Sequence, residues 1–345
     1  MIVHRLAWIA LLSLIILVIA GATVRVTGSG LGCPDWPTCW GCLIPPTNAS
    51  QIDVDKLDLE KFKKHAARKG IDPDTITRET VLESFDPVHT WIEFSNRLAS
   101  LPLGFATLFL AVFSFGVKRN RAWIIGLSIF SLLDVIVNAV MGAIVVRSGL
   151  QPGVITLHMG LAFLLIVVLV TIIWLSRPER DQNSPALAQR RKLQIVSIIF
   201  FACLFGEGLL GSQLREQTDE LAITSETDQG IERDQWRAEL GATLIYKVHR
   251  SFSWSLLVAA GLLFFWTRSS DVQVAEPKLI FAMVIAMMLM GVVLGHIAIY
   301  PVIQVLHVGM TSVLLAVTWH WVMRLWSLQS AGAKVANAAA TKAVV

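Results

Sequence analysis

Two stretches of the chain share one pattern and together decide its fold. Residues 141–160 read MGAIVVRSGLQPGVITLHMG, and residues 290–309 read MGVVLGHIAIYPVIQVLHVG. Glycine, proline and histidine recur at the same offsets without a gap, in strongly apolar sequence. Because an ionisable group inside an apolar span is costly and usually functional, the repeat predicts two related metal or cofactor pockets, one in each half of the chain.

The composition is that of an integral membrane protein. The 345 residues are 54% hydrophobic and 16% charged, with a mean hydropathy of +0.63, which is more apolar surface than a soluble domain can bury. The net charge of +4 is small, and no nucleic-acid motif is present. About 20 apolar residues span a bilayer as a helix, and eight runs reach that length: 7–25, 92–116, 122–146, 152–176, 192–213, 241–267, 277–300 and 302–326.

The repeat extends beyond the two histidine blocks. Four further pairs of residues occupy matching positions: Gly21 and Gly211, Arg25 and Arg215, Asn96 and His249, and Arg97 and Arg250. A duplicated unit of four spans explains these matches and keeps both copies in the same orientation. We therefore predict an all-α integral membrane protein whose eight transmembrane helices form two four-helix bundles related by a pseudo-twofold axis.

The positions of the basic residues predict the orientation. Lysine and arginine follow the even-numbered spans and, with Arg5, fall on one side of the membrane. By the positive-inside rule both termini are cytoplasmic, in the inner membrane of a bacterium. The chain is predicted to have two halves, 1–176 and 192–326, joined by a cytoplasmic linker, 177–191. The first half contains an outward loop, 26–90, and a disordered tail, 327–345, follows the second half. A second outward loop, 214–240, is acidic.

His249 and His307 are the strongest candidate ligands. Each lies one or two turns inside its span, and two neutral imidazoles presented from opposite sides of a bundle match a six-coordinate haem. A zinc or copper site needs further ligands nearby, and none is obvious in the sequence. The alternative is a pair of buried histidines that hydrogen-bond to neighbouring helices.

The first half differs at one of the two matching positions. His158 corresponds to His307, but Asn96 stands where the repeat predicts histidine. Since asparagine is a poor iron ligand, a haem bound here has one open or weakly occupied face, as a substrate pocket needs. The alternative is decay of one of two equal sites.

Charged residues flank these positions. Glu93 lies three residues before Asn96, on the same helical face, where an acid at the pocket mouth can exchange protons. The alternative is an interfacial carboxylate in solvent. Arg97 and Arg250 either bind haem propionates or extend to the membrane interface.

Other polar residues have several readings. Asp134 and Glu207 are buried acids that either carry protons or pair with arginine or histidine. Cys33, Cys39 and Cys42 follow the first span on the oxidising side, where a disulfide forms readily. Cys33–Cys39 is the preferred bridge, although the spacing alone leaves the pairing open.

From about residue 5 to residue 326 the chain resembles the heme A synthase family. The resemblance rests on RVTGSGLGCPDWPTCWG at 25–41, WIEFSNR at 91–97, VITLH at 154–158, YKVHR at 246–250 and PVIQVLH at 301–307. The chain departs from the family pattern at Asn96, where most members carry histidine.

The resemblance implies an enzyme that oxidises a methyl group of haem O to a formyl group by successive hydroxylations, giving haem A for cytochrome c oxidase. It implies haem b as a cofactor between His249 and His307, a substrate site at Asn96 and His158, an essential acid at Glu93 and a cysteine pair at Cys33 and Cys39. The implied partners are haem O, haem O synthase and cytochrome oxidase assembly factors. The electron acceptor and a homo-oligomeric state are left open.

Two other functions compete with this one. A dihaem b-type electron-transfer protein serving the quinone pool predicts two saturated haems. A transporter built on a repeat predicts helices broken at the membrane midplane.

Overall fold

The computed structural model describes residues 1–68, 72–148, 150, 153–177, 190–227, 233–268, 274–297 and 299–342. Eight helices in these residues are long and apolar enough to cross a membrane, which confirms the predicted all-α membrane fold. They are α1 (Ile2–Val26), α4 (Pro87–Ser114), α5 (Arg121–Arg147), α6 (Val154–Ser176), α7 (Arg190–Thr227), α9 (Leu244–Arg268), α10 (Ala275–Val292, continued as a π-turn, Val293–Ile297) and α11 (Pro301–Lys342).

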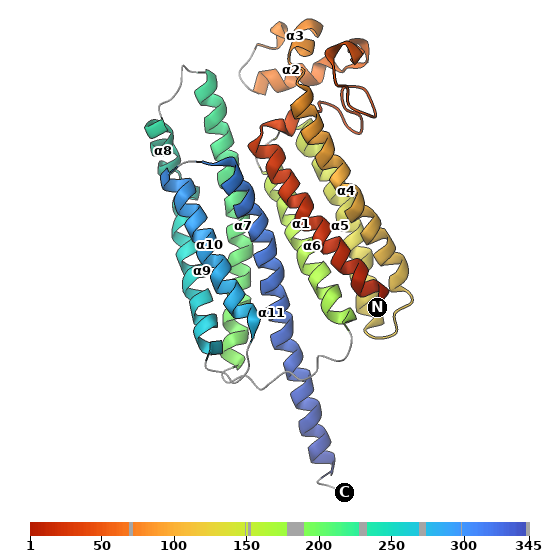
Figure 1. Cartoon of the computed structure of the whole chain (residues 1–345), viewed down its shortest axis with the longest axis vertical. Helices are drawn as coiled ribbons and strands as arrows, with labels where there is room; N and C mark the ends of the chain where they lie inside the picture. The colour runs from red at the N-terminus through yellow and green to blue at the C-terminus, as the bar shows by residue number, and fades with distance from the viewer. Residues whose placement is uncertain are drawn as a thin grey trace.

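The shorter helices lie outside the spans. They are η1 (Ser29–Leu31), η2 (Ala49–Gln51), η3 (Val54–Lys56), α2 (Leu59–Arg68), η4 (Pro73–Thr75), α3 (Arg78–Glu83) and α8 (Arg233–Ala242). All but α8 belong to the segment between α1 and α4, which lies over the ends of these two helices (Figure 1). We call this end the loop end; the N-terminus and the last turns of α11 lie at the opposite end (Figure 1).

The eight spans form two rings of four helices. In the first ring each helix packs against two neighbours in the order α1, α4, α5, α6, and α6 closes back on α1. In the second ring the order is α7, α9, α10, α11, and α11 closes back on α7. The rings meet where α11 contacts α1 and α6, and where α6 contacts α7 (Figure 1). Both rings have the contact order that a duplicated unit requires; the pseudo-twofold axis stays a prediction.

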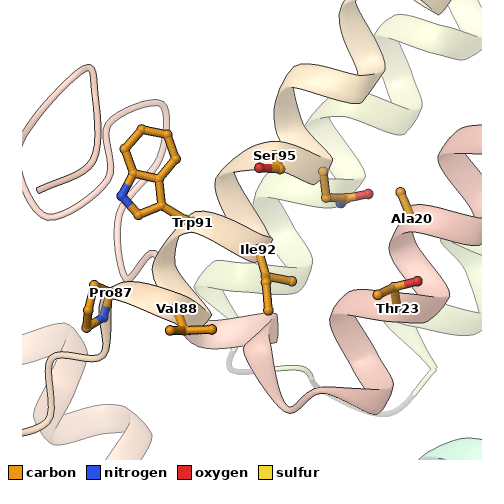
Figure 2. Close-up of a pocket in the computed structure, with 8 residues that line it drawn as sticks. Ala20, Thr23, Pro87, Val88, Trp91, Ile92 and Ser95 are labelled. Atoms are coloured by element: carbon orange, nitrogen blue, oxygen red, sulfur yellow. The ribbon is translucent and has the colours of Figure 1, made fainter. Parts of the chain in front are cut away.

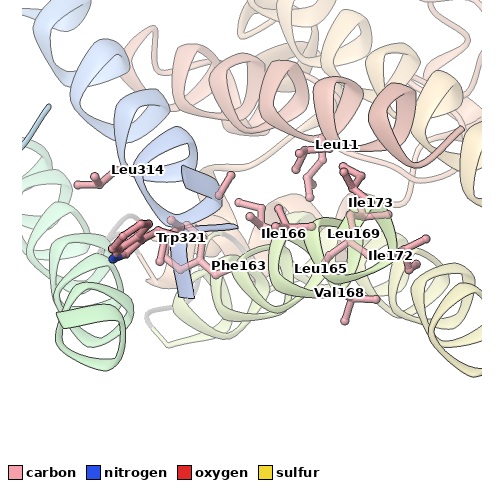
Figure 3. Close-up of a cluster of buried hydrophobic side chains, with 14 of the residues drawn as sticks. Leu11, Phe163, Leu165, Ile166, Val168, Leu169, Ile172, Ile173, Leu314 and Trp321 are labelled. Carbon is pink, nitrogen blue, oxygen red and sulfur yellow. The ribbon is translucent and has the colours of Figure 1, made fainter. Parts of the chain in front are cut away.

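The largest hydrophobic core lies at the junction of the two rings. Helix α6 is the most buried span, and Phe163 and Leu169 on it are almost fully buried beside Leu11 of α1 (Figure 3). From α11, Trp321 is fully buried, and its indole Nε1 donates to Ser197 Oγ of α7 at 2.9 Å. Apolar side chains from both rings therefore form one continuous core.

Glycines allow close approach at two equivalent seams between the rings. A Cβ on Gly309 of α11 would lie 2.8 Å from Ile19 Cγ1 of α1, and a Cβ on Gly160 of α6 would lie 3.5 Å from Leu209 Cδ2 of α7. Ile19 and Leu209 stand two residues before Gly21 and Gly211, so they also match in the repeat. The same kind of contact thus recurs at both seams.

The segment between α1 and α4 has a small core of its own. Trp40 packs edge-on against Phe85, with ring centroids 5.2 Å apart, and lies 6.0 Å from Phe62. Cys33 and Cys39 are fully buried in the same cluster. The predicted outward loop is therefore a folded cap rather than an open loop.

Two predicted boundaries differ from the structure. Helix α7 continues to Thr227, through residues for which we predicted an acidic outward loop; the three glutamates and two leucines of 214–227 favour helix. Helix α11 continues to Lys342, although we predicted disorder for 327–345; that stretch is rich in alanine, the strongest helix former. Of the predicted linker, 177–191, residues 178–189 lie outside the described residues.

Candidate functional site

His249 and His307 lie on opposite helices of the second ring. His249 is the sixth residue of α9 and His307 the seventh of α11, and these helices are diagonal partners because each packs against α7 and α10. Both imidazoles bury an Nδ1 atom that has no hydrogen-bond partner, while both residues keep part of their surface accessible.

Helix α7 places a carboxylate beside His249. Glu207 Oε1 lies 3.1 Å from His249 Nδ1, which is hydrogen-bond distance, although the ring is not oriented for a hydrogen bond. Ser253, one turn after His249, donates from Oγ to Glu207 Oε1 at 2.6 Å and to the His249 carbonyl at 2.7 Å. Opposite the ring, a Cβ on Gly211 would lie 3.3 Å from His249 Cε1, so glycine leaves room for the imidazole.

The first ring repeats this geometry with different side chains. Asn96 of α4 and His158 of α6 lie on diagonal helices. Asn96 Oδ1 and His158 Nδ1 are buried without hydrogen-bond partners. A Cβ on Gly21 would lie 4.0 Å from Asn96 Oδ1, so Asn96 faces Gly21 as His249 faces Gly211. The structure therefore places the asparagine at the position that the histidine occupies in the other ring.

A groove of about 700 Å³ opens between α1 and α4 near the loop end (Figure 2). Its lining is largely apolar, with Asn96 among the polar residues; the other lining residues are Ala20, Thr23, Pro87, Val88, Trp91, Ile92 and Ser95. Neither Glu93 nor His158 lines this groove. Asn96 is thus the candidate site residue that the groove reaches.

Glu93 faces the cap instead of the groove. Its side chain is 5% exposed, and Arg97 Nη2 donates to its Oε1 at 2.6 Å. Its Oε2 accepts a hydrogen bond from the Cys33 backbone N–H at 2.8 Å. The sequence placed Glu93 at a pocket mouth; in the structure both of its oxygens are engaged within the protein.

Arg97 joins α4 to the cap. Its Nη1 donates to the carbonyl oxygens of Asp35 and Thr38, both at 2.9 Å. Its Nη2 donates to the Cys33 carbonyl at 3.2 Å in addition to Glu93. Both terminal nitrogens of Arg97 therefore donate to carbonyl oxygens of the cap. We had predicted that Arg97 binds a haem propionate. The propionate role of Arg97 stays a prediction.

The cysteines pair as preferred. Cys33 and Cys39 form a disulfide, and Cys42 is a free thiol whose backbone forms a two-residue bridge with Cys39. The Asp35 carboxylate accepts hydrogen bonds from the Trp40 and Gly41 backbone N–H groups and from Thr38 Oγ1. The bridge and these bonds fix the loop that Arg97 and Glu93 hold.

The remaining polar residues lie apart from these positions. Arg250 is exposed, with its guanidinium carbon 5.8 Å from the centre of the Tyr246 ring. Asp134 is buried in α5 and accepts a hydrogen bond from Asn138 Nδ2 at 2.8 Å. The sequence analysis missed Ser253; its signal is its position one turn after His249, on the same face.

The second ring fits a haem better than a free metal ion. Among the described residues, no group of three or more histidine, cysteine, aspartate or glutamate side chains is arranged to hold a metal. Two facing imidazoles complete the coordination of a porphyrin iron, since the porphyrin supplies the other four ligands. Both histidines are partly accessible, so a porphyrin iron could reach a ring nitrogen of each.

Comparison with known proteins points to one family. Residues 4–319 match the model of the COX15-CtaA family, described as cytochrome oxidase assembly proteins. The chain is 24% identical over 298 residues to the heme A synthase of Shouchella clausii, covering 84% of this chain and 85% of that protein. It is 26% identical over 227 residues to the heme A synthase of Shewanella oneidensis, covering 64% of this chain and 60% of that protein. It is 26% identical over 203 residues to the heme A synthase of Bacillus cereus, covering 58% of this chain and 53% of that protein. The chain thus spans less than two thirds of two of these relatives.

Proposed function

The chain belongs to the COX15-CtaA family of cytochrome oxidase assembly proteins, and from this premise we propose that it is a heme A synthase. In this proposal the enzyme oxidises the methyl group of haem O to a formyl group by successive hydroxylations, and the haem A product serves cytochrome c oxidase. The relatives named heme A synthase support this activity.

His249 and His307 hold the resident haem, for which we propose haem b. The diagonal placement of α9 and α11 supports this assignment. When bound, the haem supplies a one-electron redox centre. Arg250, exposed one residue after His249, is the proposed propionate ligand of this half, with Arg97 as its counterpart in the first half.

His158 and Asn96 form the proposed site for haem O. The observation that carries the proposal is the change from histidine to asparagine at one of two matching positions. A carboxamide is a weak iron ligand, so His158 anchors the substrate from one side and the Asn96 side stays open. The groove that reaches Asn96 supports entry of a flat, largely apolar molecule between α1 and α4.

Glu93 stays in the proposal as the acid that the reaction requires. Its hydrogen bonds to Arg97 and Cys33 support a specific task, to hold the disulfide loop over the loop end of the first ring. A closed cap there excludes water from the substrate site. A group on this border can also exchange protons with solvent.

We propose that the protein lies in the bacterial inner membrane with both termini in the cytoplasm. The eight apolar helices support a multi-pass protein, and both ends of the described chain lie opposite the cap (Figure 1). Haem O synthase and cytochrome oxidase assembly factors are the proposed partners.

Pigment analysis tests the function. Cells that make haem O but lack their own heme A synthase are given this chain, and the extracted haems are separated. We expect haem A to appear, and to be absent with His158→Ala. A dihaem electron carrier would leave haem O unconverted, and that result would overturn the proposal. Asn96 also disagrees with a carrier, which needs two saturated irons.

A further inference from the structure

A buried acid beside His249 has no place in the function proposed so far. Glu207 is 6% exposed in the middle of α7, where an ionisable side chain is costly to keep. Its Oε1 contacts His249 Nδ1 and Ser253 Oγ, and its Oε2 is buried without a partner. Because burying an ionisable side chain here costs free energy, we expect Glu207 to have a specific role.

The position of the carboxylate relative to the imidazole is informative. An imidazole has two nitrogens, and when one binds iron the other needs a hydrogen-bond acceptor to fix the tautomer and the ring plane. Glu207 Oε1 lies 3.1 Å from Nδ1, which leaves Nε2 as the nitrogen directed away from this carboxylate. Ser253 holds the same oxygen at 2.6 Å, so the carboxylate is itself anchored.

The internal repeat provides a comparison within the same chain. If Gly21 is aligned with Gly211, Leu17 is aligned with Glu207. If Asn96 is aligned with His249, Ser100 is aligned with Ser253. In the first ring Ser100 Oγ donates to the Arg97 carbonyl, and no carboxylate stands at the Leu17 position. The second ring therefore has both Glu207 and His249. The first ring has Leu17 and Asn96 at the matching positions.

We propose that Glu207 is a positioning residue: when haem binds, the His249 ring turns so that its Nδ1–H donates to Glu207 Oε1, which now lies 3.1 Å away, and its Nε2 is presented to the resident haem. The inference rests on the proposed function, since it takes His249 to be an iron ligand. A carboxylate acceptor makes the imidazole a stronger electron donor, which stabilises ferric haem and lowers the midpoint potential. Glu207 does not touch the reacting atoms.

The test uses the full-length chain, purified with its haem, as wild type and as Glu207→Leu, Glu207→Gln and Glu207→Asp. The readouts are haem content, the rate of haem loss to an acceptor protein and the midpoint potential from the reduced and oxidised spectra. We expect Glu207→Leu to lose haem about tenfold faster or more and to raise the potential of the haem that remains. Glu207→Gln, which keeps the shape without the charge, is expected between the two, and Glu207→Asp is expected to restore part of both properties.

Asp134→Asn is the matched control, because Asp134 is also a buried acid in a span but lies in the first ring. It is expected to leave the potential and the rate of haem loss unchanged. A wild-type chain that binds no haem overturns the proposed function together with this inference. A haem-loaded wild type whose potential and haem loss are unaffected by both Glu207→Leu and Glu207→Gln overturns this inference alone. Because Glu207→Gln preserves volume, a folding defect in the leucine variant does not obscure the result.

Discussion

The two rings have the same helix order and different chemistry at matching positions. In the second ring His249 and His307 lie on diagonal helices, and Glu207 Oε1 lies 3.1 Å from His249 Nδ1. In the first ring His158 faces Asn96, and Leu17 stands where the acid would be. The comparison teaches that one duplicated scaffold can present different side chains at matching positions: histidine and glutamate in the second ring, asparagine and leucine in the first.

The largest expected effect comes from removing one of the two proposed haem ligands of the second ring. We expect His249→Ala to weaken haem b binding strongly and to lower haem A formation, because the haem iron would lose one of its two proposed histidine ligands. Haem stoichiometry and the optical spectrum of the purified protein measure the loss. An unchanged spectrum would contradict the assignment of His249.

We expect substitutions at the two candidate residues of the first ring to have unequal effects on haem A yield. We expect His158→Ala to reduce haem A yield by at least tenfold, as loss of a ligand typically does, and Asn96→Ala to be tolerated far better. Haem A per unit of membrane protein, in cells that make haem O, measures the difference. Equal losses from both variants would mean that Asn96 ligates or positions the substrate as strongly as His158 does.

The cap belongs to the first ring, and Arg97 is its main link to that ring. Arg97→Ala removes hydrogen bonds to three cap carbonyls and leaves Glu93 buried without its cation. Loss of one partner of a buried ion pair costs about 3–5 kcal/mol, so we expect a lower thermal midpoint and faster proteolysis within 27–86. Arg250→Ala, at the matching exposed position, is the control, and an equal loss of stability there would argue against a special role of Arg97.

The two seams between the rings should differ in tolerance. Gly309→Ala introduces a Cβ 2.8 Å from Ile19 Cγ1, whereas Gly160→Ala introduces one at an ordinary 3.5 Å from Leu209. Overpacking typically costs about 1–3 kcal/mol, so we expect Gly309→Ala to be the less stable of the two in thermal unfolding. The reverse order would show that the α1–α11 seam is the looser one.

The smallest expected effect concerns the first turns of α4 and α9. Asp86 caps α4 by accepting from the Val88 and His89 backbone N–H groups, and these bonds hold the pKa of its carboxyl below the usual 3.8. A lowered folded pKa contributes stability that is present above pH 3.8 and is lost as the pH falls through the folded value. The protection of the Val88 amide from hydrogen exchange, relative to its intrinsic rate at each pH, should therefore fall at acidic pH, while the protection of Tyr246, capped by neutral Thr243, should not change in this way.

Much of the fold could be predicted from the sequence because a bilayer imposes length and apolarity on every span. The repeat also identified His249, His307, His158 and Asn96, which the structure places on diagonal helices of the two rings. The direction of Glu93 could not be predicted, because Asn96 lies on nearly the same face of one helix. Only the folded cap, with Cys33 and Arg97 in contact, shows that the carboxylate is held there. The length of α7 was missed because helix formers outside the apolar run carry no membrane signal.

The long α7 has a mechanical consequence. Beyond its apolar run, Glu216 accepts hydrogen bonds from the Gly153 backbone N–H at 2.9 Å and from Thr156 Oγ1 at 3.0 Å, within one turn of His158. Nine residues earlier the same helix carries Glu207 beside His249, a rise of about 13.5 Å along its axis. One continuous helix therefore contacts His249 in the second ring and the start of α6 near His158 in the first, so a change in the tilt of α7 would move the surroundings of both histidines together.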